Sequence, residues 1–325
     1  MKIAVTGSTG HIATSVIALL AEKKFSVRAL QHIYNKGFGN LPVEIYTGDL
    51  SKPYSLQDFT SGCDVVIHCA ARISINSNKD PEVYKTNMNG SINMFHAAVK
   101  SGVKRFIHVS SIHAYQQLPI TGMLTEACDY CSNKSPAYDR SKRDAQKYVM
   151  ENARGAMEVI VLNPTCVIGP PDPRPSLMGK AIIDMYNKKI PTLLNGGFDF
   201  CDVRDIAHGI VESIEKGKPG QAYLLSGKWY SLKALYKMIM EMKQEPIYVP
   251  VLPGWMAYAW LPVITWLAAI KKEEPLYTHE SLGALLNGNK HINCEKAMRD
   301  LGYQCRPLTD TVRDTIRWYR EKGLL

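Results

Sequence analysis

The sequence predicts an α/β fold, in which helices cover both faces of a doubly wound parallel sheet. The chain opens with a short apolar strand, a glycine turn and an apolar helix. Nearly continuous apolar runs then alternate with segments of helical periodicity, which is typical of parallel strands joined by helices. Past Pro170 this alternation becomes irregular. We therefore expect a smaller C-terminal substrate domain that is interwoven with the main one.

Composition places the chain among globular proteins. Its 325 residues suit a domain of ordinary size plus a smaller one, and a hydrophobic content of 46% argues against disorder. Eight cysteines are too few for a disulfide scaffold, and no signal peptide precedes the first strand, so a cytoplasmic location is expected.

The charge pattern argues against nucleic acid as a partner. The formal net charge is +9, but the basic residues are scattered and form no long block, so an anionic cofactor suffices. Cys128 and Cys131 form a lone C-x-x-C pair without a second pair or a nearby His, so no metal site is expected.

The first strand, residues 3–5, runs into a turn with Gly7, Thr9 and Gly10. Glycine lets the backbone approach a ligand closely, and the following helix directs its unpaired N–H groups there, where a phosphate fits. The spacing differs from the G-x-G-x-x-G dinucleotide fingerprint, so a turn without a ligand is the alternative.

The second strand is expected over residues 26–31. In a dinucleotide-binding fold the end of the second strand lies at the adenosine ribose. An acidic residue there binds the 2′-hydroxyl of NAD, and a basic residue binds the 2′-phosphate of NADP. Gln31, His32 and Lys36 follow here, with no acidic residue before Glu44. This favours NADP over NAD; the alternative is that Arg28 and Lys36 are only solvated surface charges.

Further strands are expected over residues 43–46, 64–68 and 105–109, with a helix over 82–100. The residues directly after these strands include Asp49 and Leu50, then Cys69, Ala70 and Ala71, and then Ser111. Because ligands of parallel sheets bind beyond the carboxyl ends of the strands, these segments and the glycine turn predict one cleft.

The next helix begins near residues 135–136 and carries Tyr138 and Lys142 on one face, four residues apart. A Tyr with its ordinary pKa of about 10 is a poor base at neutral pH, but an adjacent ammonium favours the phenolate. With Ser111, this pair predicts a Ser-Tyr-Lys site for proton transfer.

These motifs make the chain similar to the extended short-chain dehydrogenases/reductases, also called the NAD-dependent epimerase/dehydratase family. The matching stretches are residues 6–13, 48–50, 68–71, 109–111, 138–142 and 163–170, together with Asn87. The resemblance implies a Rossmann-type fold. Residues 170–175 and 203–207 resemble the dihydroflavonol-reductase-like and hopanoid-associated sugar-epimerase-like group, and residues 110–112 and 138–142 resemble 3β-hydroxysteroid dehydrogenases.

The resemblance also implies roles for single residues. Ser111 would hydrogen-bond the substrate oxygen, Tyr138 would transfer the proton, and Lys142 would bind the nicotinamide ribose and lower the pKa of Tyr138. The expected cofactor-binding residues include His32, which directly follows the second strand. The full set is Gly7, Thr9, Gly10, His11, Ile12, His32, Asp49, Leu50, Cys69, Ala70, Ala71, Asn87, Tyr138, Lys142, Asn163, Pro164 and Val167.

One departure concerns dehydration. Sugar 4,6-dehydratases of this superfamily carry an Asp-Glu pair directly after the position of Ser111, whereas Ile112 and His113 stand there in this chain. Dehydration is therefore disfavoured.

The expected NAD(P)-binding domain covers residues 1–169, and residues 200–227 return to it; the substrate domain covers residues 170–199 and 228–325. Beyond Pro170 the elements expected are helices over 178–186, 203–215, 231–242, 294–301 and 308–319 and a strand over 222–225.

Residues 247–270 carry Trp255, Trp260 and Trp266 and no charge. Prolines interrupt the run, which disfavours a transmembrane helix. An apolar lid or core segment is the preferred interpretation, and contact with a membrane surface is a second one.

Together these observations predict an NADP(H)-dependent oxidoreductase that interconverts a carbonyl and a secondary alcohol on a medium-sized, partly apolar small-molecule substrate. A nucleotide-sugar epimerase with tightly bound NAD is one alternative, and a non-catalytic dinucleotide sensor is another. Assembly as a homodimer is open.

Overall fold

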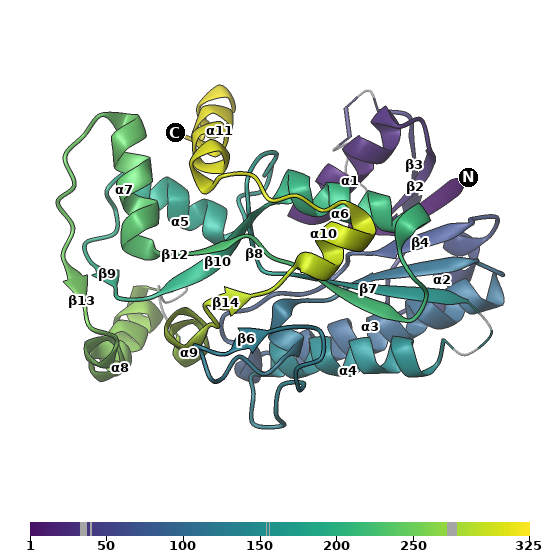
Figure 1. Ribbon diagram of the computed structural model, residues 1–325, viewed down its shortest axis with the longest axis horizontal. Helices are drawn as coiled ribbons and strands as arrows, with labels where there is room; N and C mark the ends of the chain where they lie inside the picture. The colour runs from purple at the N-terminus through teal and green to yellow at the C-terminus, as the bar shows by residue number, and fades with distance from the viewer. Residues whose placement is uncertain (33–37, 40, 154, 156, 272–277) are drawn as a thin grey trace.

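A seven-stranded parallel sheet forms the centre of the molecule (Figure 1). The computed structural model describes residues 1–325 apart from 33–37, 40, 154, 156 and 272–277. In spatial order the strands are β11 (Gln221–Leu225), β7 (Glu158–Pro164), β5 (Arg105–Val109), β4 (Val65–His68), β1 (Lys2–Thr6), β2 (Ser26–Gln31) and β3 (Val43–Thr47). The order reverses at β1, so the sheet is doubly wound, as the sequence predicted.

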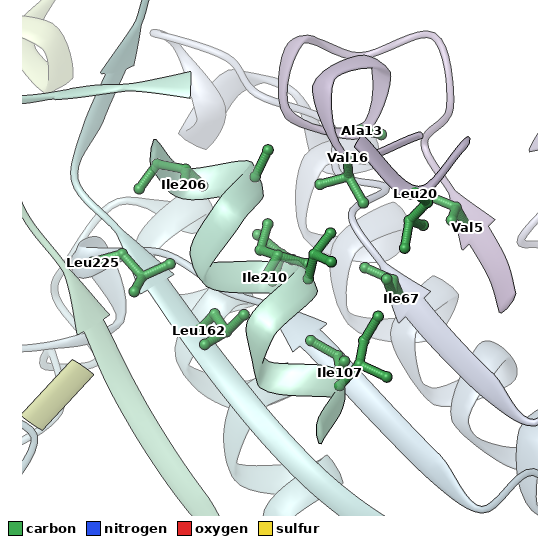
Figure 2. Packing of buried hydrophobic residues seen from close by; sticks show 14 of the residues in the cluster. Val5, Ala13, Val16, Leu20, Ile67, Ile107, Leu162, Ile206, Ile210 and Leu225 are labelled. Atoms are coloured by element: carbon green, nitrogen blue, oxygen red, sulfur yellow. The ribbon is translucent and has the colours of Figure 1, made fainter. Parts of the chain in front are cut away.

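Helices cover both faces of this sheet because successive strand residues point to opposite sides. Ile3 and Val5 pack with helices α1 and α6, whereas Ala4 packs with helices of the opposite face. Figure 2 shows the first of these contacts, in which apolar side chains of α1 and α6 meet those of the strands. The bounds are α1 (His11–Glu22) and α6 (Val203–Lys216) on one face, and α2 (Pro53–Thr60), α3 (Pro81–Lys100) and α4 (Ala137–Glu151) on the other.

A second cluster of buried apolar residues holds the smaller part of the chain together. Its sheet has the order β12-β10-β8, in which β10 is parallel to β8 and antiparallel to β12. The elements are β8 (Cys166–Ile168), α5 (Leu177–Tyr186), β9 (Leu193–Leu194), β10 (Gly197–Asp202), β12 (Lys228–Ser231), α7 (Leu232–Lys243), β13 (Val251–Leu252), α8 (Gly254–Lys271), α9 (His279–Asn287) and α11 (Leu308–Glu321).

Short elements complete the fold and link the two parts. They are β6 (Met123–Leu124), which pairs with β14 (His291–Ile292), the single turns η1 (Ser77–Lys79) and η2 (Ile112–Ala114), and α10 (Glu295–Leu301). Helix α10 lies against α6 and β11, and its Ala297 and Leu301 belong to the buried cluster of the main sheet. The division into two domains at fixed residue numbers stays a prediction.

The described secondary structure agrees with the sequence predictions where hydrophobic periodicity is strong. Strands 26–31 and 105–109 have the expected bounds, and Ser231 caps α7 by accepting a hydrogen bond from the Ala234 N–H at 3.1 Å. Helix α2 and the three-stranded sheet were not predicted, because their short segments carry little periodic signal.

The Trp-rich segment differs in part from the expected lid or core. Helix α8 runs through Pro262, and Ala257 and Leu261 are buried in the second cluster. Trp255 and Trp260, however, are 71% and 57% exposed, so neither belongs to the core. No helix in the described part of the chain is both long and apolar enough to cross a membrane.

Candidate active site

The glycine turn after β1 is shaped by a close approach of two backbone segments. Gly7 has φ +68°, and a Cβ on it would lie 2.7 Å from the Ala70 Cα, so only glycine fits. The Gly10 N–H donates to the Gly7 carbonyl at 2.8 Å, and Gly10 occupies the N-cap position of α1, which has no side-chain cap. The first N–H groups of α1 are therefore free of a capping side chain, which suits a dinucleotide pyrophosphate.

A buried hydrogen-bond chain locks the ends of β1 and β4 together beneath this turn. The Thr6 hydroxyl contacts His68 Nδ1 at 2.8 Å and accepts the Ala70 N–H at 3.2 Å. His68 Nε2 meets the Ser91 hydroxyl of α3 at 3.0 Å. These contacts hold the Ala70 backbone against Gly7, as the close approach requires.

The structure brings Ser111, Tyr138 and Lys142 together beyond the carboxyl end of β5. The Ser111 side chain lies near enough to the Tyr138 hydroxyl to lower the pKa of Tyr138. The Lys142 ammonium is buried and donates to the Val109 carbonyl at 3.1 Å. The three side chains that the sequence selected thus converge from β5 and α4.

The pKa of Tyr138 differs from the sequence prediction. Burial raises the pKa of Tyr138 to about 12, although the Ser111 side chain opposes this rise and Asp139 adds to it. Burial also lowers the pKa of Lys142 to about 8. The expected lowering of the Tyr138 pKa by the adjacent ammonium is therefore not found: burial has the largest effect on this pKa, and the ammonium is bound to the Val109 carbonyl. Tyr138 is a protonated phenol at neutral pH.

His113 also lies at the site, although no role was predicted for it. Its Nδ1 lies 3.4 Å from Asp139 Oδ1, its N–H donates to the Ser111 hydroxyl at 3.2 Å, and its ring meets the Tyr138 ring edge-on with centroids 5.9 Å apart. Burial opposes charge on this ring, yet Asp139 raises the pKa of His113 above its ordinary value. The sequence signal that could have indicated a role for His113 is the departure of residues 112–113 from the dehydratase pattern.

Asn163 holds the backbone of Ser111 in place through a hydrogen bond. Its Nδ2 donates to the Ser111 carbonyl at 3.0 Å and to Gln146 Oε1 at 2.7 Å, so β7 and α4 both hold the end of β5. Asn163 is fully buried, and its Oδ1 finds no partner among the described residues.

Asn87 ties α3 to the loop after β4 and to the Tyr-Lys helix. Its Oδ1 accepts the Arg72 N–H at 2.7 Å, and its Nδ2 donates to the Arg72 carbonyl and the Ser141 hydroxyl, both at 3.0 Å. All of its described polar contacts are therefore within the protein, which points to a supporting role.

The residues expected at the adenosine end also lie near one another. His32 Nδ1 is 3.4 Å from Asp49 Oδ2, and Asp49 Oδ1 accepts the Ser51 N–H at 2.8 Å. The Leu50 carbonyl accepts from Asn93 Nδ2 at 2.8 Å. Asp49 is 17 residues away from His32 in the sequence, so the local pattern after the second strand did not indicate this acidic neighbour. Lys36 lies outside the described residues.

The remaining candidates follow the same edge of the sheet. His11 Nε2 contacts the Gly169 carbonyl at 2.7 Å, so α1 is fastened to the end of β8. The others lie in the glycine turn (Thr9), the first turn of α1 (Ile12), the segment after β4 (Cys69, Ala71), the end of β7 (Pro164) and β8 (Val167). Cofactor binding by these residues stays a prediction.

The described residues contain no group of three His, Cys, Asp or Glu side chains able to hold a metal ion. Cys128 and Cys131 are free thiols, and burial raises the pKa of Cys131 to about 11.

Comparison with known proteins places these features in context. The sequence profile of the NAD dependent epimerase/dehydratase family matches residues 3–226. The chain is 27% identical to sterol demethylase protein B of Methylococcus capsulatus, with all of both chains covered. It is 24% identical to the 4-hydroxy-2-methyl-3-oxo-4-farnesyl-3,4-dihydroquinoline-1-oxide ketoreductase of Stigmatella aurantiaca, over 98% of this chain and 96% of that one. The crystal structure of gox2253 superimposes with a TM-score of 0.84 at 29% identity, over 99% of both chains.

Proposed function

The chain belongs to the NAD dependent epimerase/dehydratase family, and we propose that within it the protein is an NADP(H)-dependent oxidoreductase. Its reaction interconverts a carbonyl and a secondary alcohol on a medium-sized, partly apolar substrate. The grouping of the Ser111 and Tyr138 side chains, with the buried ammonium of Lys142 bound to the Val109 carbonyl, carries this proposal.

The protein's part in the reaction follows from the site. A bound nicotinamide dinucleotide supplies the hydride. The Gly7–Ala70 approach and the uncapped start of α1 fit its pyrophosphate. Ser111 orients the substrate oxygen, and the Tyr138 hydroxyl donates its proton to that oxygen as negative charge develops there. Lys142 fits the ribose hydroxyls as a hydrogen-bond donor.

The protonated Tyr138 suits proton donation to a carbonyl. With a pKa of about 12, the phenol holds its proton throughout the neutral range. Reduction of a carbonyl consumes a proton, which this group can donate, and oxidation of the alcohol would use the same group in reverse.

Two relatives support an apolar substrate. One is named for sterols, and the other is named as a ketoreductase of a farnesylated quinoline oxide. Carbonyl reduction on a largely hydrocarbon skeleton is therefore our proposed reaction class.

The cofactor prediction is that NADPH binds more tightly than NADH. The Asp49 carboxylate already interacts with His32 and the Ser51 N–H, so it is engaged rather than offered to a 2′-hydroxyl. Fluorescence titration of the purified protein with each cofactor measures the preference, and tighter binding of NADH would refute it.

The same samples test the reaction. Loss of NADPH fluorescence with apolar ketones or aldehydes is expected. Tight cofactor binding without net oxidation, followed by interconversion of nucleotide sugars, would instead establish the epimerase. Cofactor binding without turnover of either the carbonyl compounds or the nucleotide sugars would favour the non-catalytic dinucleotide sensor.

Exposed aromatic side chains lead to a prediction about membrane surfaces. Tyr248, Trp255 and Trp260 are 85%, 71% and 57% exposed around α8, and such rings favour the lipid–water interface. With a net charge of +9, we expect the protein to cosediment with phosphatidylglycerol-containing vesicles. Replacing Trp255 and Trp260 with Ser should weaken binding by about tenfold or more, since the lost burial is worth at least ~1.4 kcal/mol.

The control is Tyr54→Ser, which removes an aromatic ring that is 89% exposed from α2 in the main domain. Equal binding by the double Trp variant and the Tyr54 variant would rule out α8 as the contact.

A further inference from the structure

The N-terminus of the Tyr-Lys helix is capped by side chains from another part of the chain. Pro136, at the cap position of α4, makes no side-chain hydrogen bond to it. Instead, the Ala137 N–H donates to Asn78 Oδ1 at 2.9 Å, and the Tyr138 N–H donates to the Ser77 hydroxyl at 3.0 Å. Two of the N–H groups that a helix leaves unpaired are thus satisfied by η1.

Helix α9 holds the single turn η1 in place. The Glu280 carboxylate accepts the Ser77 N–H at 2.7 Å, the Ser77 hydroxyl at 2.6 Å and the Asn78 N–H at 2.8 Å. Thr278, the N-cap of α9, donates its hydroxyl to the Ile75 carbonyl. Hydrogen bonds to a carboxylate are stronger than neutral ones, so Glu280 is the main anchor of this turn.

The Ser77 hydroxyl connects the two sets of contacts. It has one proton, which it donates to Glu280, and its remaining lone pairs face the Tyr138 N–H. Without the carboxylate, the hydroxyl is free to rotate and the cap on Tyr138 weakens. Ser77 is buried, so water does not readily replace the lost partner.

We propose that Glu280 is a positioning residue that fixes the backbone of Tyr138 through Ser77 and Asn78. The inference rests on the proposed function, in which Tyr138 transfers the proton. Glu280 touches neither Tyr138 nor Lys142, and it belongs to a helix more than 130 residues further along the chain. Placement of the substrate-domain helix α9 thereby determines the placement of the proton donor.

The first test is Glu280→Gln, which keeps the size of the side chain but replaces one acceptor oxygen with an amide donor. Hydrogen exchange of the Ala137 and Tyr138 amides, followed by mass spectrometry of short peptides, should accelerate by at least about fivefold for the loss of roughly 1 kcal/mol. In turnover with an apolar ketone, kcat should fall about 10- to 100-fold, as for a small misplacement of a catalytic group. KM and the Kd for NADPH should stay within about twofold, because no group that binds either ligand is altered.

Two further variants make the test specific. Glu295→Gln is the matched control, since Glu295 also lies in the first turn of a helix but its hydrogen bonds among the described residues are to neighbouring Asn293. Ser77→Ala removes the hydroxyl that links the Glu280 carboxylate to the Tyr138 N–H. Because both changes act through one path, the double variant Ser77→Ala, Glu280→Gln should be no slower than the slower single variant.

Each outcome decides the proposal. Unchanged exchange at residues 137–138 in Glu280→Gln overturns it, as does accelerated exchange with unchanged kcat. Additive losses in the double variant would also overturn it. If the wild-type protein reduces no carbonyl, the proposed function fails, and the exchange measurement alone then decides whether Glu280 holds the start of α4.

Discussion

Tyr138→Phe is expected to lower kcat for carbonyl reduction by roughly 10²- to 10⁴-fold, the range that a positioned general acid contributes. The substitution removes only the hydroxyl that lies near Ser111 and would donate the proton. The ring remains to pack against His113, so the fold should be retained. Steady-state loss of NADPH fluorescence measures kcat, and titration without substrate measures the Kd for NADPH, which should change little.

A control on the same helix separates the loss of a proton donor from the loss of any tyrosine hydroxyl. Tyr148→Phe removes a hydroxyl that contacts His96 Nε2 at 2.8 Å, away from Ser111 and Lys142. Its kcat should match that of the wild type. Comparable activity of Tyr138→Phe and Tyr148→Phe would refute the assignment of Tyr138 as the proton donor.

Gly7→Ala is expected to abolish tight NADPH binding and to destabilise the protein. The added Cβ would lie 2.7 Å from the Ala70 Cα and 2.8 Å from the Ala70 N, both backbone atoms that the Thr6–His68 hydrogen bonds hold in place. The positive φ adds strain of about 1 kcal/mol. Together they should lower the free energy of unfolding by more than about 2 kcal/mol.

The chain supplies a matched control for this substitution. Gly62 has φ +70°, nearly the same as Gly7, but nothing lies within 4 Å of the place where its Cβ would be. Gly62→Ala should therefore cost only the strain of about 1 kcal/mol and leave the Kd for NADPH unchanged. Urea unfolding and fluorescence titration measure the two effects. Equal destabilisation by both substitutions would show that the contact with Ala70 is unimportant.

Much of the site follows from local sequence patterns. The strand and helix pattern over residues 1–109 predicted a parallel sheet, and the ends of its strands then placed the glycine turn and Ser111 at one edge. Tyr138 and Lys142 are four residues apart, so helical geometry alone puts them on one face. Each of these inferences needs only residues that are close together in the chain.

Ionisation could not be predicted in the same way. The sequence placed an ammonium beside Tyr138 and suggested a lowered pKa, but the pKa is raised to about 12. The reason is burial, which depends on how all the surrounding segments pack. Likewise, the raised pKa of His113 arises from Asp139, which belongs to a different helix.

The sequence by itself determined the doubly wound sheet, the glycine turn and the choice of Ser111, Tyr138 and Lys142, since periodicity and short spacings specify them. The tertiary structure alone decided that Ala70 closes on Gly7 and that Glu280 caps the start of α4 through Ser77. Ser77 and Glu280 are 203 residues apart. Contacts between segments so distant depend on packing of the whole chain, and no local pattern encodes them.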